Sequence, residues 1–152
     1  MATLISNSPE ETEALGELWG RAAGRGLVIG LSGELGAGKT QLVKGIARGL
    51  GIAARVHSPT FTLLNEYRGG RLRLFHLDLY RLGSREEIVS AGLEDYFDQP
   101  DGLAVIEWAE KWFGGLPNEE GGMQKSPDRY RRVCFDQLGE QQRRITYEDS
   151  GA

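Results

Sequence analysis

The chain has 152 residues, of which 39% are hydrophobic and 26% charged, and its formal net charge is −4 at pH 7. This length suits one domain with a full hydrophobic core. The mixed charge gives no sign of a surface that coats nucleic acid, and no apolar run reaches the roughly 18 residues that a membrane span needs.

The first residues lack the basic region and apolar core of a signal peptide. The single cysteine, Cys134, excludes an internal disulfide and suits a reducing compartment. We therefore expect a cytoplasmic protein with no membrane segment. Cys134 lies between Val133 and Phe135, and we expect it to be a small core residue.

The N-terminal region predicts a strand at residues 3–6 and then an amphipathic helix. Ser8 suits the N-cap of this helix, and Pro9 suits its first position. We expect the helix to end near Ala23, because Gly24 follows. Its buried face is expected to carry five apolar residues: Ala14, Leu15, Leu18, Trp19 and Ala22.

The next stretch carries the most informative motif of the chain. An apolar run at residues 27–31 is typical of a buried parallel strand, and the segment after it fits G-x-x-x-x-G-K-[ST]. That segment reads Gly33, Glu34, Leu35, Gly36, Ala37, Gly38, Lys39 and Thr40. Residues 41–50 predict a helix whose apolar face carries Leu42, Val43, Ile46, Ala47 and Leu50, with Gly51 closing it.

This pattern has a specific chemistry. The glycines let successive backbone N–H groups turn around a phosphate. Lys39 can place its ammonium on the β- and γ-phosphates, and the Thr40 hydroxyl can bind Mg²⁺. The helix directs its positive N-terminal end at the same anion. We therefore predict a nucleotide site here, rather than a glycine-rich turn with an unrelated lysine.

A segment rich in hydroxyl groups follows, and a strand-like run to Tyr67 comes after it. The segment consists of Ser58, Pro59, Thr60, Phe61 and Thr62. These hydroxyls could sense the γ-phosphate or the metal as a switch, or they could reflect ordinary turn and strand chemistry. Composition does not decide between the two.

Residues 71–82 alternate and predict a strand that follows a hairpin turn at Gly69 and Gly70. One face of this strand would carry Leu72, Leu74, His76, Asp78 and Tyr80, and the other Arg73, Phe75, Leu77 and Leu79. The sequence from Ser84 to Glu87 is a capping box that starts a short helix. Residues 93–97 predict another short helical piece.

Two carboxylates directly follow apolar runs. Asp78 follows residues 74–77, and Glu107 follows residues 103–106. Such a position indicates either a site residue or a strand end that meets solvent. Beside a phosphate loop, we interpret both as site residues that hold the metal and orient the attacking water. His76 fits a role at the metal and a place in the core equally well.

Residues 114–128 are rich in glycine and polar residues and predict a mobile loop. Residues 129–137 and 143–148 then predict a closing antiparallel strand pair. Its arginines could form one basic strip or a solvated edge that prevents aggregation: Arg129, Arg131, Arg132, Arg143 and Arg144. The expected fold is α/β, a single P-loop NTPase domain over residues 1–152 with a C-terminal antiparallel strand pair.

Taken together, five blocks resemble one family, the bacterial TsaE (formerly YjeE) proteins. They are residues 33–40, 58–63, 76–82, 92–97 and 106–108, and their order and spacing match across most of residues 27–112. These proteins are small ATPases required to make threonylcarbamoyladenosine at position 37 of tRNAs. The resemblance implies a mostly parallel central sheet flanked by helices. It also implies ATP and Mg²⁺ as cofactors and the TsaB–TsaD pair as the protein partner. ATP hydrolysis would support turnover of that assembly, and direct contact with tRNA is left open.

The resemblance also assigns roles to residues. It implies that Glu107, Lys39 and Asp78 are catalytic and that Thr40, Asp78 and Glu107 lie on the metal side. Nucleotide contacts would come from residues 33–41, which include Gln41, and from Thr60, Thr62 and Trp108. Two residues depart from the family pattern. Gln41 replaces a second threonine, and Ala109 replaces a proline, which leaves the chain path past Glu107 less fixed.

Two other functions stay open at this point. A small P-loop kinase would need an acceptor pocket and a lid, and only residues 114–128 with Arg129 at their edge offer one. A nucleotide-gated binding module without significant hydrolysis is the second alternative. Glu107 argues against it, because a pure binder has no use for a second acid.

Overall fold

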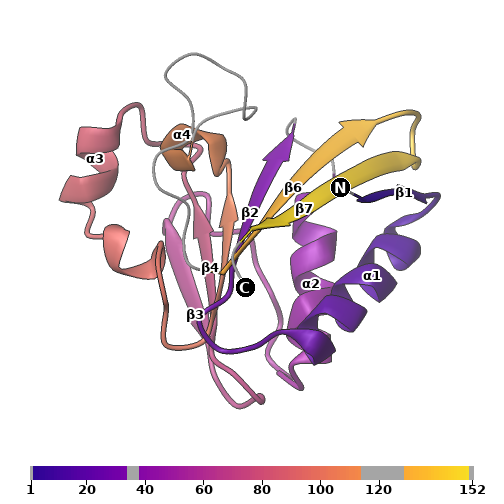
Figure 1. Cartoon of the computed structure of the whole chain (residues 1–152), viewed down its shortest axis with the longest axis horizontal. Coiled ribbons are helices and arrows are strands. Elements are labelled where there is room, and N and C mark those ends of the chain that lie inside the picture. Colours follow the sequence, from indigo (N-terminus) through magenta and orange to yellow (C-terminus); the bar gives the residue numbers. More distant parts are fainter. Residues whose placement is uncertain (1, 34–37, 114–128, 151–152) are drawn as a thin grey trace.

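In the computed structural model, residues 2–33, 38–113 and 129–150 are described. They form a seven-stranded sheet with the order β1-β7-β6-β2-β5-β4-β3 (Figure 1). The strands are β1 Ala2–Ser6, β2 Val28–Gly33, β3 Leu64–Tyr67, β4 Leu74–Asp78, β5 Leu103–Glu107, β6 Tyr130–Gln137 and β7 Arg143–Ser150.

The sheet is mixed. The four central strands β6, β2, β5 and β4 run parallel, whereas β1, β7 and β3 pair antiparallel with their neighbours. The predicted α/β class and the closing antiparallel pair are therefore confirmed. The centre of the sheet is parallel, as predicted, and hairpins join β3 to β4 and β6 to β7 in antiparallel pairs. The antiparallel pairing of β1 with β7, from opposite ends of the chain, was not predicted.

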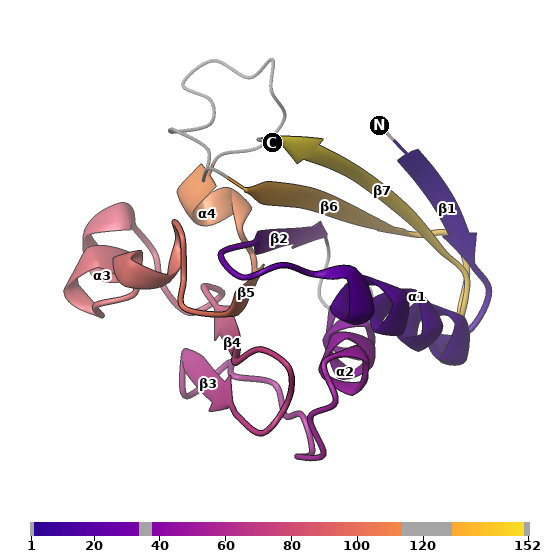
Figure 2. The ribbon, with the colours of Figure 1, turned by 60° about the horizontal axis from the view of Figure 1, so that its bottom comes forward.

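Helices cover both faces of the sheet. Helices α1 (Pro9–Ala22) and α2 (Lys39–Gly49) lie together on one face. On the other face lie α3 (Arg85–Ser90), the 3₁₀ helix η1 (Glu94–Tyr96) and the unpredicted α4 (Glu110–Phe113), and Figure 2 shows the same division from another side. The predicted N-caps are confirmed, since the Ser8 and Ser84 hydroxyls accept hydrogen bonds from the backbone N–H groups of Glu11 and Glu87.

The two helices of the first face touch through their backbones. A Cβ atom added at Gly16 would lie 2.3 Å from the carbonyl oxygen of Leu42, and one at Gly45 would lie 2.0 Å from that of Glu13. Glycine at these positions lets α2 pack directly on α1, while its predicted apolar face is buried against the sheet. The same contact corrects the buried face predicted for α1. Leu18 is 60% exposed, and Ala14 and Ala22 are exposed as well, because the buried side of this helix is built partly from glycine.

Each face of the sheet has its own hydrophobic core. The alternation of faces predicted for residues 71–82 is confirmed in β4, which is shorter than predicted. Leu74 belongs to the cluster under α1 and α2, whereas Phe75 and Leu77 belong to the cluster under α3 and α4. Strand β4 ends at Asp78, not at residue 82, because the chain turns there. All five of its residues are buried, as expected for a strand covered on both faces.

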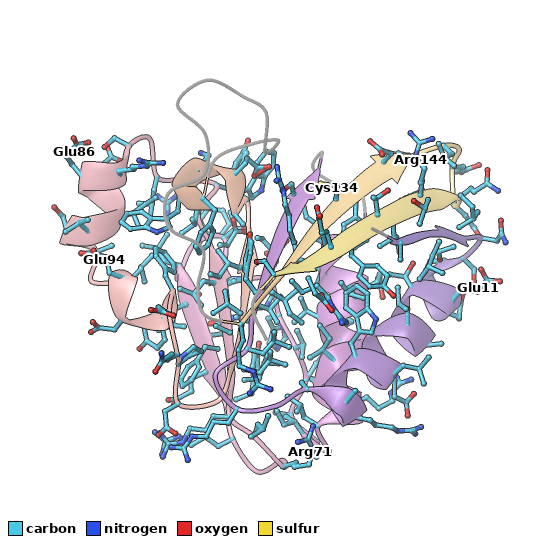
Figure 3. The ribbon with its side chains drawn as sticks, viewed as in Figure 1. Glu11, Arg71, Glu86, Glu94, Cys134 and Arg144 are labelled. Carbon is cyan, nitrogen blue, oxygen red and sulfur yellow. The ribbon has the colours of Figure 1, made fainter. Side chains whose placement is uncertain are left out.

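Strand β6 overturns two predictions. Val133 and Phe135 face α1 and α2, so the half-buried Cys134 between them points to the opposite face and is not a core residue (Figure 3 labels it). For the same reason Arg131 and Arg132 lie on opposite faces, and a single basic strip is wrong. Arg131 binds Asp149 and stacks on Trp19.

The helix contact predicts a large effect for a small change. Gly45→Ala should lower the free energy of unfolding by about 2–3 kcal/mol, because the clash with the Glu13 carbonyl outweighs the roughly 1 kcal/mol gained in helix propensity. Urea unfolding followed by circular dichroism measures this. The matched control is Gly139→Ala, whose added Cβ meets only the Gln142 side chain at 3.9 Å. Equal stability of the two variants would contradict the direct helix contact.

Candidate functional site

A cavity of about 300 Å³ lies where β2, β4 and β5 end. The parallel register places Asp78 beside Glu107 and Glu107 beside Leu31, so the carboxyl ends of these strands meet at one edge. Residues from both halves of the chain line the cavity. Those predicted from the sequence are Gly38, Lys39, Thr40, Gln41, Ser58, Thr60, Asp78, Glu107 and Trp108.

Lys39 is a buried cation at the start of α2. Its side chain donates a hydrogen bond from Nζ to the carbonyl oxygen of Gly33 at 2.9 Å, and Nζ lies 4.0 Å from the centre of the Trp108 ring. The residue is only 4% exposed. Burial lowers the pKa of Lys39, while the carboxylates of Glu107, Glu110 and Asp78 oppose that shift. Within the described part of the chain, Lys39 has no ion-pair partner, so its ammonium can receive an anion from outside.

Asp78 connects two segments through its carboxylate. Oδ2 accepts a hydrogen bond from the Thr60 hydroxyl at 2.8 Å, and Oδ1 accepts one from the backbone N–H of Tyr80 at 2.9 Å. The Ser58 hydroxyl lies 2.9 Å from that of Thr60 and extends the chain of contacts. Thr62 is placed differently, because its hydroxyl donates to Asn65 and its side chain does not line the cavity.

Glu107 is held by His76. The two side chains are buried, and Nε2 of His76 lies 2.5 Å from Oε2 of Glu107. The other ring nitrogen of His76, Nδ1, is buried without a hydrogen-bond partner in the described structure. The position of His76 was open from the sequence, and the structure assigns it to the second acid. When Glu107 is ionised, His76 donates the Nε2 proton to it and fixes the carboxylate.

Trp108 follows Glu107 in a left-handed backbone conformation, with φ of 59°. A non-glycine residue there costs about 1–2 kcal/mol, and the strain turns the indole back over Lys39 and against Tyr80, whose ring centre is 5.2 Å away. The backbone N–H of Ala109 donates to the carbonyl oxygen of Leu31 at 3.1 Å. A proline has no such donor, so this hydrogen bond is available only because residue 109 is not a proline.

Sequence reasoning missed four residues that line the cavity: Pro9, Thr12, Gln141 and Arg143. They come from the start of α1 and from the β6–β7 hairpin, which the pairing of Ser6 with Arg143 brings to this edge. No local motif marks them, since only the sheet topology joins them to the loop. Four predicted residues, Glu34, Leu35, Gly36 and Ala37, lie outside the described residues, as does the predicted loop at residues 114–128.

The donor set suits a small hard cation. Thr40 and Asp78 contribute a hydroxyl and a carboxylate, and both are oxygen ligands. Over the described residues, no group of three or more histidine, cysteine, aspartate or glutamate side chains could hold a metal by itself. Mg²⁺ is typically held by one or two carboxylates together with water and substrate phosphates. The residues present therefore fit a Mg²⁺ that arrives with a nucleotide.

Comparison with known proteins agrees with the family predicted from the sequence motifs. A family model described as threonylcarbamoyl adenosine biosynthesis protein TsaE matches residues 6–144. The chain belongs to the TsaE family. It is 41% identical over 134 residues to the tRNA threonylcarbamoyladenosine biosynthesis protein TsaE of Bacillus subtilis, covering 87% of this chain and 83% of that one. The TsaE protein of Nostoc is 46% identical over 114 residues, with 73% and 70% covered.

A solved structure, YdiB of Bacillus subtilis, aligns with a TM-score of 0.73 at 34% identity, covering 99% of this chain and 86% of that one. The predicted family is thus confirmed, and with it a place in the biosynthesis of threonylcarbamoyladenosine in tRNA. No described helix is both long and apolar enough to cross a membrane.

The contact between Lys39 and Trp108 predicts an optical signal. ADP should change the tryptophan fluorescence of the parent protein, because a phosphate that draws on Lys39 alters the environment of the indole. Trp108→Phe should lose most of this change. The matched control is Trp112→Phe, whose indole packs on Phe97 away from the cavity. A Trp108→Phe protein that keeps the full ADP-induced change would show that Trp108 is only a packing residue.

Proposed function

We propose that this chain is a P-loop ATPase that binds ATP with Mg²⁺ and hydrolyses it. The observation that carries the proposal is the content of one cavity, in which Lys39, Thr40, Asp78 and Glu107 meet from three separate elements. These are a buried cation, a hydroxyl and two carboxylates in different settings. A site that only binds ATP would need the cation and the hydroxyl, whereas a site that hydrolyses ATP also needs the two carboxylates.

The triphosphate is bound at the start of α2. The positive end of an eleven-residue helix and the ammonium of Lys39 both favour an anion there. Gly38, with φ of 96°, takes the left-handed conformation that lets the chain enter the helix close to a phosphate. Because Nζ of Lys39 is already held by Gly33, little side-chain freedom is lost when the phosphate arrives.

Thr40 and Asp78 would hold the Mg²⁺, which when bound neutralises charge on the phosphate oxygens. The carboxylate of Asp78 keeps its orientation through Thr60 and Tyr80, so it is aimed before the ligand enters. The contact also gives the hydroxyl-rich segment a physical role, because Thr60 is bound to the same carboxylate that would hold the metal.

Glu107 is the carboxylate that we propose orients and deprotonates the attacking water. His76 occupies Oε2, which leaves Oε1 to accept a hydrogen bond from water and then its proton. The water oxygen forms the new bond to the γ-phosphorus while the bond to the β,γ-bridging oxygen breaks, giving ADP and phosphate. His76 is a positioning residue in this scheme, since it touches Glu107 and not the reacting atoms.

Membership of the TsaE family supports a protein partner in the threonylcarbamoyladenosine machinery. We infer that this partner is the TsaB–TsaD pair and that ATP hydrolysis supports its turnover. The small-molecule kinase and the non-hydrolysing binding module remain the alternatives. Phosphate release from ATP, measured alone, with TsaB–TsaD and with hydroxyl acceptors, separates the three.

The first functional prediction concerns the metal side. Asp78→Asn should slow Mg²⁺-dependent ATP hydrolysis by at least about 100-fold, because one charge at the metal is lost. Its thermal melting should stay cooperative, since the Thr60 hydroxyl can rotate to accept from the new amide. Steady-state phosphate release at several Mg²⁺ concentrations is the measurement. Hydrolysis at the parent rate would remove Asp78 from the metal.

The second functional prediction separates ATP binding from ATP hydrolysis. Glu107→Gln should bind ATP nearly as well as the parent but hydrolyse it about 100- to 10,000-fold more slowly, because the proton acceptor is gone. Lys39→Ala should instead lower ATP affinity by about 100-fold or more. ATP affinity and single-turnover hydrolysis are measured side by side.

The matched control for this pair is Glu110→Gln, which removes another half-buried carboxylate near Lys39 that does not line the cavity. It should hydrolyse ATP close to the parent rate. If Glu107→Gln loses ATP binding as severely as Lys39→Ala, Glu107 is a structural or metal-binding residue and the proposed role in chemistry is wrong.

A further inference from the structure

The hydroxyl-rich segment, residues 58–62, contains no helix or strand. It nevertheless carries Thr60, whose hydroxyl donates a hydrogen bond to Oδ2 of Asp78 at 2.8 Å. A segment outside regular structure keeps one conformation only where contacts offset the conformational entropy that it loses. Other groups of the protein must therefore hold this segment against Asp78.

One side chain of β3, that of Asn65, binds both ends of the segment. Its Nδ2 donates to the carbonyl oxygen of His57 at 3.1 Å, directly before the segment begins. Its Oδ1 accepts from the hydroxyl of Thr62 at 3.0 Å, where the segment ends. The donor and the acceptor of one amide group are thus used on the two ends of the same stretch of chain. Asn65 closes this stretch as a bridge.

Tyr67, two residues further along β3, binds the same backbone. Its hydroxyl accepts a hydrogen bond from the N–H of His57 at 3.0 Å and donates one to the carbonyl oxygen of His57 at 3.4 Å. The ring of Tyr67 is buried in the core under α1 and α2. Because alternate residues of a strand project from one face, Asn65 and Tyr67 reach His57 from the same side. The start of the segment is therefore fixed to a packed part of the core.

The end of the segment is fixed to β4. The N–H of Leu63 donates to the carbonyl oxygen of Pro59 at 2.7 Å, and the N–H of Asp78 donates to the carbonyl oxygen of Leu63 at 3.0 Å. Leu63 takes a left-handed conformation with φ of 69°, which is strained for a residue other than glycine. Such strain persists only where the surrounding contacts determine the path of the chain. The segment is thus held at both ends, with Thr60 between them.

We propose that Asn65 and Tyr67 are positioning residues for the metal side of the candidate site. By fixing the segment, they hold the Thr60 hydroxyl where it orients the carboxylate of Asp78. Neither side chain is among the described residues that line the cavity, so both act through Thr60. The inference rests on the proposed function in one respect: Asp78 is taken to be a ligand of Mg²⁺.

The contacts of Asn65 and Tyr67 give the expected effect its direction. In the described part of the chain, their side chains bind His57, Thr62 and each other, and not the phosphate side at Lys39. Loss of either side chain should therefore reduce what Mg²⁺ adds to nucleotide affinity and leave the affinity without metal unchanged. A residue that served only the fold would change both affinities.

The test measures the affinity of the full chain for the non-hydrolysable ATP analogue AMP-PNP, with Mg²⁺ and with EDTA, by isothermal titration calorimetry. The ratio of the two affinities is the Mg²⁺ effect. Asn65→Ala removes two hydrogen bonds and should reduce this ratio about 10-fold, and Tyr67→Phe should reduce it about 3- to 10-fold. The matched control is Glu66→Ala, which lies between them on the opposite face of β3, pairs with Arg68 and should leave the ratio unchanged.

A double-mutant cycle tests the route through Thr60. Thr60→Val keeps the shape of the side chain but removes the hydroxyl that binds Asp78, so it should reduce the Mg²⁺ effect by itself. Adding Asn65→Ala to Thr60→Val should then change the ratio less than about twofold, because the contact through which Asn65 acts is already lost. Two losses that multiply would contradict this route.

Hydrogen exchange provides a readout that needs neither metal nor nucleotide. The N–H groups of His57 and Leu63 are both hydrogen-bonded in the parent. Asn65→Ala and Tyr67→Phe should speed exchange of the peptide that spans residues 57–63 by about 10-fold, because its local opening becomes easier. Exchange in α2 should stay at the parent rate, which separates local release of the segment from unfolding of the whole domain.

The outcomes are distinct. A Mg²⁺ effect in Asn65→Ala and Tyr67→Phe equal to that of the parent would overturn the inference and leave the proposed ATPase intact. Equal losses of affinity with Mg²⁺ and with EDTA would also overturn it, because the two side chains would then only support the fold. Equal binding by the parent in both conditions would show that the proposed Mg²⁺ site itself is wrong, and the inference with it. A reduced Mg²⁺ effect at unchanged metal-free affinity supports the inference.

Discussion

The arrangement of this protein depends on burying an ammonium and two carboxylates at one edge of a parallel sheet. Each charge is compensated by a different group: Gly33 and Trp108 for Lys39, Thr60 and Tyr80 for Asp78, and His76 for Glu107. Buried charges cost free energy even when they are hydrogen-bonded. A buried cluster of charges is therefore weak evidence that these residues stabilise the fold. It is stronger evidence that a ligand binds among them.

The stability has to come from elsewhere, and the two cores supply it. Parallel strands covered on both faces bury apolar side chains along their whole length, and the backbone contact of α1 with α2 brings a helix start to the end of β2. The glycines at positions 16 and 45 let α2, the helix that begins at Lys39, lie directly against α1.

Local patterns predicted the elements whose cause is local. The face of α2, the caps at Ser8 and Ser84 and the acids after two buried strands follow from spacing and residue type alone. Leu18 was misplaced because a glycine face gives no hydrophobic signal, although glycine spaced four apart in both helices could have indicated it. Arg143 was missed for another reason. Its place in the cavity depends on the pairing of β1 with β7, which joins chain segments more than 130 residues apart.

The two acids differ in what else they touch, and this difference links the site to the surface. Glu107 is bound to a fully buried histidine, so a change there stays inside the protein. Asp78 is bound to Thr60, in the hydroxyl-rich segment, and to the backbone N–H of Tyr80, whose side chain is exposed. If occupancy of the Asp78 side alters how a partner docks, the docked partner must alter nucleotide affinity by the same factor, because coupling between binding sites is reciprocal. The partner would then change nucleotide affinity through the carboxylate of Asp78, which is also the proposed Mg²⁺ ligand.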